Sequence, residues 1–354
     1  MTLSRRGLVL SGAAGLLTSG CAAGLAAYAG GSPQDVAAKT GVCHSTYAVL
    51  RGGVPEQPVV LHGCGPSDPR GADAVMQAAS LTKPVVAFTA LALAREGRID
   101  LGLPVSTYLP DGYVHRQKPF ARNEDGRTDR VSAATLARIP VSSLLNHTSG
   151  LPNWSGGALV PVSEPGQSWR YSGEGYLLLQ AVIAAATGDS LEAAVASRVF
   201  APSGMRDSRL YLTDDIRDRV VEGTGRMGGA RHFRFTGANA AASLYTTAGD
   251  YAKFMASLAS SGLMPMIVQA PVPVDTDLGL SWGLGWGIEQ APGGLYLWQW
   301  GNNPGYRAFA MLSVTTGDGF ILMTNSEKGL QLAPALAQAA VPSDHGVFRF
   351  HMLG

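Results

Sequence analysis

The pattern of apolar and polar positions divides the chain into strand-like ends and a helical middle. Alternating or β-branched runs bounded by Gly- and Pro-rich turns predict strands, which fall at residues 41–50, 59–64, 282–289, 295–300, 306–314 and 320–325. Apolar positions with helical spacing predict helices, which fall at 83–96, 173–187, from 189 onward, at 251–258 and at 330–341. We therefore expect an α/β chain of the α+β type: an antiparallel sheet flanked by helices and completed by both termini, with an inserted, mainly helical lobe.

These patterns also suggest where the domains begin and end. We place the α/β sheet domain at residues 36–83 and 244–354, and the helical lobe at 84–243. Asp189 is expected to cap the helix that follows it, with Glu192 as its capping-box partner. The highly charged stretch 116–130 is expected to be a solvated surface loop.

Residues 1–35 read as an export signal and spacer. Ser4-Arg5-Arg6-Gly7-Leu8 resembles a twin-arginine signal, and the apolar run that follows is too short to span a bilayer. Two processing outcomes remain open. Cys21 in an imperfect lipobox would become a lipidated membrane tether, whereas cleavage after Ala27-Tyr28-Ala29 would give plain secretion. The protein is expected to be periplasmic, secreted or lipid-anchored.

The other two cysteines, Cys43 and Cys64, lie in the two strands of the first predicted hairpin. They would come opposite each other there, so a disulfide formed in an oxidising compartment and a pair of buried thiols are both open. The net charge of +1 in 354 residues gives no electrostatic footprint for nucleic acid. No metal-ligand spacing is present, and we expect no cofactor and a small-molecule or peptide substrate.

The segment Ser80-Leu81-Thr82-Lys83 carries the strongest chemical signal. Residues three apart on a helix share one face, so the lysine amine can reach the serine hydroxyl. A hydroxyl becomes a good nucleophile only beside a base, and a lysine in a low-dielectric site can supply one. Pro84 fits a helix only in its first turn, which places Ser80 at the helix start, where its N–H is free to hold an oxyanion. The structural alternative is a helix cap beside a solvated lysine.

Two further motifs are candidates for the same site. Tyr171 lies just before the apolar helix 173–187, and two nearby positive charges would lower the pKa of its phenol and make it a candidate base. The segment Gln299-Trp300-Gly301-Asn302 places a glycine in a strand, which marks close approach by another backbone or a ligand. The structural alternatives are a packing tyrosine and an ordinary strand bulge.

The order of the motifs along the chain resembles the serine β-lactamase and penicillin-binding-protein superfamily. It is similar to the branch that holds class C β-lactamases, D-aminopeptidases, D,D-carboxypeptidases and related esterases. The similar segments are Ser80–Lys83, Leu144–Pro152, Pro165–Tyr176, Leu244–Asp250, Gly285–Gly287 and Gly301–Tyr306.

The resemblance implies a role for each matching residue. Ser80 would be acylated, Lys83 and Tyr171 would share its proton, and Tyr171 would be the general base. Gln299, Trp300 and Gly301 would form the third motif and, with Asn302, would bind the substrate or its oxyanion. The N–H groups of Ser80 and Asn302 would form the oxyanion hole, whereas His147 would be structural.

Two departures from the family pattern bear on the substrate. Gly173 replaces the asparagine two residues after the motif tyrosine, and neutral Gln299 replaces a lysine or histidine that would bind a substrate carboxylate. The resemblance therefore implies an exported serine hydrolase acting on an ester or amide. An acyltransferase with an amine or alcohol acceptor, and a catalytically silent binder of cell-wall peptide, are the alternatives.

Overall fold

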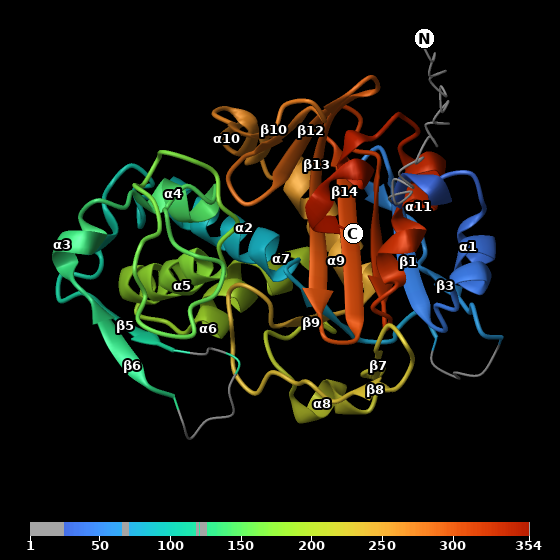
Figure 1. Ribbon diagram of the computed structural model, residues 1–354, viewed down its shortest axis with the longest axis horizontal. Helices are drawn as coiled ribbons and strands as arrows, with labels where there is room; N and C mark the ends of the chain where they lie inside the picture. The colour runs from blue at the N-terminus through green and yellow to red at the C-terminus, as the bar shows by residue number, and fades with distance from the viewer. Residues whose placement is uncertain (1–24, 66–70, 118–119, 121–125, 354) are drawn as a thin grey trace, which may run out of the picture.

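The structure is a computed structural model that describes residues 25–65, 71–117, 120 and 126–353. The twin-arginine-like segment and Cys21 lie outside these residues. The described chain forms a nine-stranded sheet in the order β10-β11-β12-β13-β14-β15-β1-β2, with β3 also paired to β1. Figure 1 shows this sheet on one side of the molecule and the helical lobe on the other. Strands from both ends of the chain meet where β1 pairs antiparallel with β15, as the sequence predicts.

The bounds of the elements follow. The strands are β1 Ser45–Arg51, β2 Val54–Pro55, β3 Val59–Leu61, β4 Met76–Ala79, β5 Tyr113–Arg116, β6 Thr128–Val131, β7 Gly223–Thr224, β8 Ala230–Arg231, β9 Leu244–Thr246, β10 Val272–Asp275, β11 Leu280–Trp282, β12 Gly287–Ala291, β13 Gly294–Asn303, β14 Tyr306–Ser313 and β15 Gly319–Thr324. The α-helices are α1 Pro33–Thr40, α2 Thr82–Arg95, α3 Ala133–Leu136, α4 Val141–Leu145, α5 Gly173–Thr187, α6 Leu191–Val195, α7 Ala201–Ser203, α8 Asp214–Arg217, α9 Ala248–Ser260, α10 Met264–Val268 and α11 Ala333–Ala340. Short 3-10 turns are η1 Leu25–Tyr28, η2 Val105–Thr107, η4 Gly329–Leu332, η5 Gly346–Arg349 and η6 His351–Leu353, and η3 Ala196–Phe200 is a π-helical turn.

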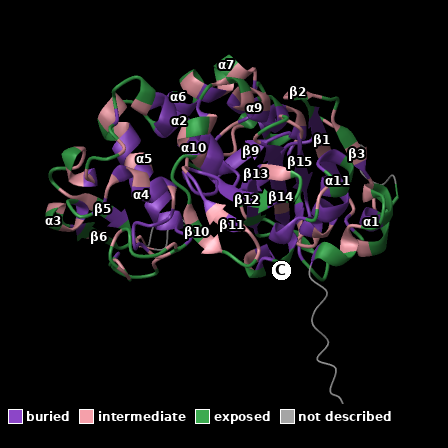
Figure 2. Cartoon of the chain, turned by 90° about the horizontal axis from the view of Figure 1, so that it is seen from above, coloured by how far each residue is buried: buried purple, intermediate pink, exposed green. Residues whose placement is uncertain are grey.

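Both faces of the sheet are buried, which explains why its last strands read as nearly continuous apolar runs. In β14, Ala308 and Ala310 face one core with α9, while Phe309 and Met311 face a second core with α1 and α11. This alternation follows the two-residue period of a strand. Figure 2 shows the resulting buried band through the sheet and the central helices. The sheet is therefore a layer between helices, and the helical lobe extends from one side of it.

Several predicted elements agree closely with the structure, and three need correction. The helix 173–187 and the hairpin of β1 and β3 are observed, with Ser45 opposite Leu61. Ser190, not Asp189, caps α6, because its hydroxyl accepts the N–H of Ala193. The predicted strand 282–289 is two strands, β11 and β12, joined by a turn.

The charged stretch 116–130 is not simply a solvated loop. Its ends belong to the paired strands β5 and β6, where His115 lies opposite Asp129. The ring of His115 is fully buried, and its Nδ1 lies 2.7 Å from a carboxylate oxygen of Asp129. Phe120, in the same stretch, packs edge-on against the ring of Trp154 at 4.5 Å. The described residues of the stretch, 116–117, 120 and 126–130, therefore contribute to a wall of the lobe.

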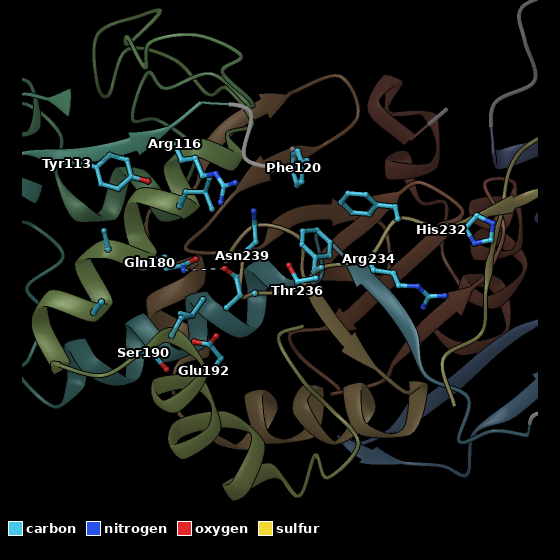
Figure 3. Close-up of a pocket in the computed structure, with 18 residues that line it drawn as sticks. Tyr113, Arg116, Phe120, Gln180, Ser190, Glu192, His232, Arg234, Thr236 and Asn239 are labelled. Carbon is cyan, nitrogen blue, oxygen red and sulfur yellow. Dashed lines mark hydrogen bonds between the residues drawn. The ribbon is translucent and has the colours of Figure 1, made fainter. Parts of the chain in front are cut away.

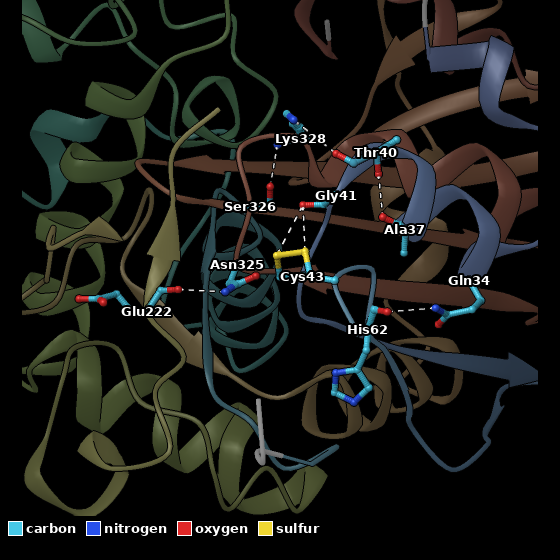
Figure 4. The surroundings of a disulfide bond; sticks show 11 residues. Gln34, Ala37, Thr40, Gly41, Cys43, His62, Glu222, Asn325, Ser326 and Lys328 are labelled. Carbon is cyan, nitrogen blue, oxygen red and sulfur yellow. Dashed lines mark hydrogen bonds between the residues drawn. A yellow bond between two sulfur atoms is a disulfide. The ribbon is translucent and has the colours of Figure 1, made fainter. Parts of the chain in front are cut away.

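Cys43 and Cys64 form a disulfide, with their Cα atoms 4.7 Å apart. The bond joins the ends of the β1–β3 hairpin, and each sulfur lies 3.8 Å from the carbonyl oxygen of Gly41 (Figure 4). Of the two alternatives that the sequence left open, the disulfide is confirmed.

The residues just before the sheet pack onto it. Leu25 in η1 and Val36 in α1 are buried in the core that contains α11. Ser32 caps α1 by accepting the N–H of Asp35. In the described part of the chain no single helix has the length and apolarity to cross a membrane, although the bent pair Gly173–Thr187 and Leu191–Ser203 meets the test by length and composition.

Candidate active site

Ser80 lies at the junction between β4 and α2, in the turn before the helix. The preceding residue, Ala79, has a φ of 50°, a left-handed conformation that costs energy for a residue with a Cβ. The carbonyl of Ser80 accepts the N–H of Lys83, so the helix turn begins at the serine itself. Pro84 lies in the first helical turn, as the sequence predicts. This strained turn holds the serine side chain at the edge of the helix, where it lines a pocket.

The side chain of Lys83 contacts the hydroxyl of Ser80. Its Nζ lies 3.2 Å from Ser80 Oγ and donates a hydrogen bond of 2.8 Å to the carbonyl oxygen of Ala241. The side chain is fully buried. Burial penalises the charged ammonium and lowers the pKa of Lys83 to about 7. A large fraction of this amine is therefore neutral near pH 7 and able to take a proton from the serine.

Tyr171 joins the pair, although not with the properties that the sequence suggested. The Nζ atom of Lys83 lies 4.7 Å from the centre of the Tyr171 ring. Burial raises the pKa of the Tyr171 phenol above its usual range, and the nearby side chains of Ser80 and Gln299 only partly oppose this. Among the described residues the hydroxyl has no hydrogen-bond partner. The expected lowering of the phenol pKa is therefore wrong, because burial dominates.

Gln299 lies behind the nucleophile rather than in the pocket. It is fully buried, and its Nε2 lies 3.4 Å from the backbone carbonyl oxygen of Ser80. Its Oε1 accepts the N–H of Trp300. The prediction that Gln299 touches substrate needs correction, since both ends of its amide are used within the protein.

Gly301 allows β13 to approach the strand that leads to the nucleophile. A Cβ at this position would lie 2.3 Å from the carbonyl oxygen of Ala78, far inside van der Waals contact. The close backbone approach expected for this glycine is therefore observed. The next residue, Asn302, lines the same pocket as Ser80. The two residues thus line one pocket, and the oxyanion hole formed by their N–H groups stays a prediction.

The pocket beside Ser80 has a volume of about 430 Å³ and a lining without charged side chains among the described residues. The sequence analysis identified four of these residues and missed the others. The lining consists of Ser80, Phe120, Asn153, Trp154, Tyr171, Phe233, Ala242, Trp300, Asn302, Asn303, Pro304 and Met352. Of the missed residues, Asn303 and Pro304 lie within the Gly301–Tyr306 motif, and the others come from loops and from the C-terminal segment, which carry no motif.

The missing motif asparagine has a steric explanation. Gly173 stands where the family pattern has that residue, and a Cβ here would lie 2.4 Å from the ring of Trp154. The indole thus occupies the space that a side chain at 173 would need. Asn153 lies next to it in the pocket wall, and its Oδ1 accepts the N–H of Gly173. An amide is therefore present in the pocket, although it comes from a different loop.

His147 supports Tyr171 and is not placed as a base. Its Nδ1 accepts the backbone N–H of Ser172 at 3.2 Å, and its ring centre lies 4.4 Å from that of Tyr171. Burial, and then the charge of Lys83, lower the pKa of His147 well below its ordinary value. A neutral ring packed under the tyrosine is consistent with the structural role expected for it.

A larger cavity of about 1160 Å³ lies next to the Ser80 pocket and shares Phe120 and Phe233 with it. Figure 3 shows Gln180 and Asn239 in its interior, and Arg234 and His232 toward one end. It contains none of the candidate catalytic residues. In the described residues no group of His, Cys, Asp or Glu side chains is arranged to hold a metal ion.

Comparison with known proteins agrees with this geometry. The family model described as Beta-lactamase matches residues 46–342. Esterase EstB of Burkholderia gladioli is 28% identical over 332 residues, which cover 73% of this chain and 79% of the esterase. Penicillin-binding protein 4* of Bacillus subtilis is 21% identical over 316 residues; the match covers 77% of this chain but only 65% of that protein.

A solved structure shows the same fold. The D-amino acid amidase of Ochrobactrum anthropi SV3, complexed with L-phenylalanine, superposes with a TM-score of 0.67 at 23% identity. The match covers 89% of this chain and 99% of the amidase.

Proposed function

The chain belongs to the beta-lactamase family, and on that premise we propose that it is a serine hydrolase that forms an acyl-enzyme at Ser80 and hydrolyses an ester or amide bond. The observation that carries this proposal is the buried Lys83 amine, 3.2 Å from Ser80 Oγ, whose pKa burial lowers to about 7. The names of similar proteins, an esterase and a D-amino acid amidase, support the reaction class.

Acylation begins with the proton of Ser80. The neutral Lys83 amine takes it while Oγ attacks the substrate carbonyl carbon, and the N–H groups of Ser80 and Asn302 stabilise the oxyanion. The leaving alcohol or amine then departs with a proton from the Lys83 ammonium, either directly or through Tyr171, which Lys83 then reprotonates, and Lys83 becomes neutral again. In deacylation, water attacks the ester carbonyl and gives one proton to Lys83, and the Lys83 ammonium passes that proton to Ser80 Oγ as the serine leaves.

The charge of the pocket narrows the substrate class. No described lining residue is charged, and Gln299 offers neither a cation nor a free amide to the pocket. A substrate carboxylate would lose its hydration without gaining a partner, which is costly. Neutral esters and amides are therefore favoured over peptides recognised through a terminal carboxylate.

Intact-mass spectrometry tests the proposal. The purified protein is incubated with short-chain nitrophenyl esters, D-amino-acid amides, a chromogenic cephalosporin and D-Ala-D-Ala peptides. A stoichiometric adduct and turnover are expected with at least one neutral ester or amide. Both should be absent in Ser80→Ala and retained in Ser260→Ala, which changes an exposed serine. A wild type that stays unmodified throughout would refute the proposal, and product analysis with competing alcohols would reveal acyl transfer.

We also propose that the protein is exported through its twin-arginine-like N-terminus. The Cys43–Cys64 disulfide supports this, since such bonds persist mainly in oxidising compartments. Replacing Arg5 and Arg6 by lysine should retain the protein in the cytoplasm of a host with twin-arginine transport, whereas export of that variant at the wild-type level would contradict the assignment.

A further inference from the structure

The C-terminal segment contributes a side chain to the active-site pocket. Met352, in the turn η6, lines the same pocket as Ser80. It lies ten positions beyond Pro342, the last residue that the family model matches. The family resemblance therefore assigns no role to it. A methionine is unbranched and polarizable, so it can shape an apolar pocket wall.

The segment is held firmly in place before it reaches the pocket. The buried ring of His345 bonds through Nδ1 to a carboxylate oxygen of Glu289 and through Nε2 to the carbonyl oxygen of Val341, each at 2.7 Å. The other oxygen of Glu289 accepts the N–H of Val347 at 2.9 Å. One buried carboxylate of β12 therefore fixes both the side chain and the backbone at the start of this segment.

A series of aromatic contacts connects the C-terminal segment to Tyr171. The ring centre of Phe350 lies 5.8 Å from Trp298 and 6.4 Å from Trp300, and Trp300 in turn lies 4.8 Å from Tyr171. Phe350 is itself buried. The backbone that carries Met352 is thus packed against the strand that lines the site, so the position of the methionine is defined by the fold.

We propose that Met352, held by the segment 345–353, closes one side of the substrate pocket and selects an uncharged apolar acyl group of limited size. The inference rests on the proposed function and adds the substrate class. Trp154, Trp300 and Met352 supply apolar walls to a pocket of about 430 Å³ with an uncharged lining. An apolar wall discriminates between acyl groups through the methylenes it accommodates, by about tenfold or more for each in favourable cases.

Two substitutions of Met352 with opposite effects on pocket size test this assignment. The measured quantity is kcat/KM for p-nitrophenyl octanoate divided by that for p-nitrophenyl acetate. Met352→Ala enlarges the pocket and should raise this ratio at least about threefold, whereas Met352→Trp should lower it by a similar factor. Arg349→Ala changes an exposed side chain of the same segment and should leave the ratio unchanged.

For the wild type, the p-nitrophenyl monoester of succinate should react at least about tenfold more slowly than the butyrate ester.

The outcomes separate this inference from the proposed function. A wild type that hydrolyses the esters, with ratios for both Met352 variants within twofold of its own, would overturn the role of Met352 alone. Equal rates for the succinate and butyrate esters would overturn the assignment of an uncharged acyl group. A wild type that forms no acyl-enzyme with any ester would overturn the proposed function and this inference with it. Melting temperatures near that of the wild type show that the variants are folded.

Discussion

Replacing Lys83 by methionine should abolish acylation and make the protein more stable at neutral pH. The amine is fully buried, and burial lowers its pKa from 10.5 to about 7. Each pKa unit corresponds to about 1.4 kcal/mol, so keeping a base in this place costs roughly 5 kcal/mol of folding free energy at pH 7. Methionine removes that cost but leaves the carbonyl of Ala241 without its donor, which costs about 1–3 kcal/mol. The expected net gain is about 2–4 kcal/mol.

The sign of the pH dependence follows from proton binding in the two states. The unfolded chain binds a proton at Lys83 below about pH 10.5, whereas the folded chain binds one only below about pH 7. Between these values the unfolded state binds more protons, so wild-type stability rises with pH. The advantage of Lys83→Met should therefore shrink from pH 7 to pH 10 and reverse there, because less than about 1 kcal/mol of the burial cost then remains to set against the unpaired carbonyl.

Urea unfolding of wild type and Lys83→Met between pH 7 and 10 measures this difference, and intact-mass spectrometry measures acylation of the same samples. Lys39→Met, which changes an exposed lysine, is the control and should stay within about 0.5 kcal/mol of wild type. If Lys83→Met were equally destabilised at both ends of the pH range, the reasoning would fail. The amine would then be a charged ammonium, held by the rings of Tyr171 and Tyr176 at 4.7 and 5.5 Å.

Three further predictions concern the parts around this amine. Gly301→Ala should lose more than about 2 kcal/mol of stability in urea unfolding and most of its acylation rate, because the added Cβ would lie 2.3 Å from a carbonyl oxygen of β4. The control Gly156→Ala, where no atom lies within 4 Å of the added Cβ, should lose neither stability nor rate. Tyr171→Phe should slow turnover but keep the rise in acylation rate near pH 7, since its phenol stays protonated; loss of that rise in a pH–rate profile would return the base role to the tyrosine. Replacing Cys43 and Cys64 together by serine should lower the free energy of unfolding by about 3 kcal/mol, because the unfolded chain regains the entropy of a loop with a sequence separation of 21. An unchanged midpoint in urea unfolding would contradict this loss of stability.

The sequence predicted the parts of the site that depend on short-range geometry. The spacing of Ser80 and Lys83 on one helix face, and the first-turn position of Pro84, follow from helix periodicity alone. The position of Tyr171 before α5 follows from the length of the apolar run. These features need no knowledge of tertiary contacts, and the structure contains each of them.

The parts that the sequence could not predict depend on contacts between distant residues. The pattern shows a glycine at 173, but only the packed structure shows that Trp154 fills the space beside it. Likewise, the raised pKa of Tyr171 results from burial, which a charge pattern does not contain. Met352 lies in no motif, and it reaches the pocket because a buried glutamate in β12 anchors the turn before it.

The neutral residue at 299 and the lowered pKa of Lys83 together explain the expected preference for uncharged substrates. Burial alone accounts for the lowered pKa of Lys83, since Gln299 brings no second cation to Ser80. A substrate carboxylate placed in the pocket would favour the charged form of a nearby amine and raise its pKa. Among the described residues no cation lines the pocket to balance it, so such a substrate would favour the protonated, inactive form of the base that its own acylation requires. Anionic substrates are therefore expected to react slowly for two reasons: their carboxylate is desolvated without a partner, and it holds Lys83 in its protonated form. Neutral esters and amides leave the Lys83 amine able to accept a proton.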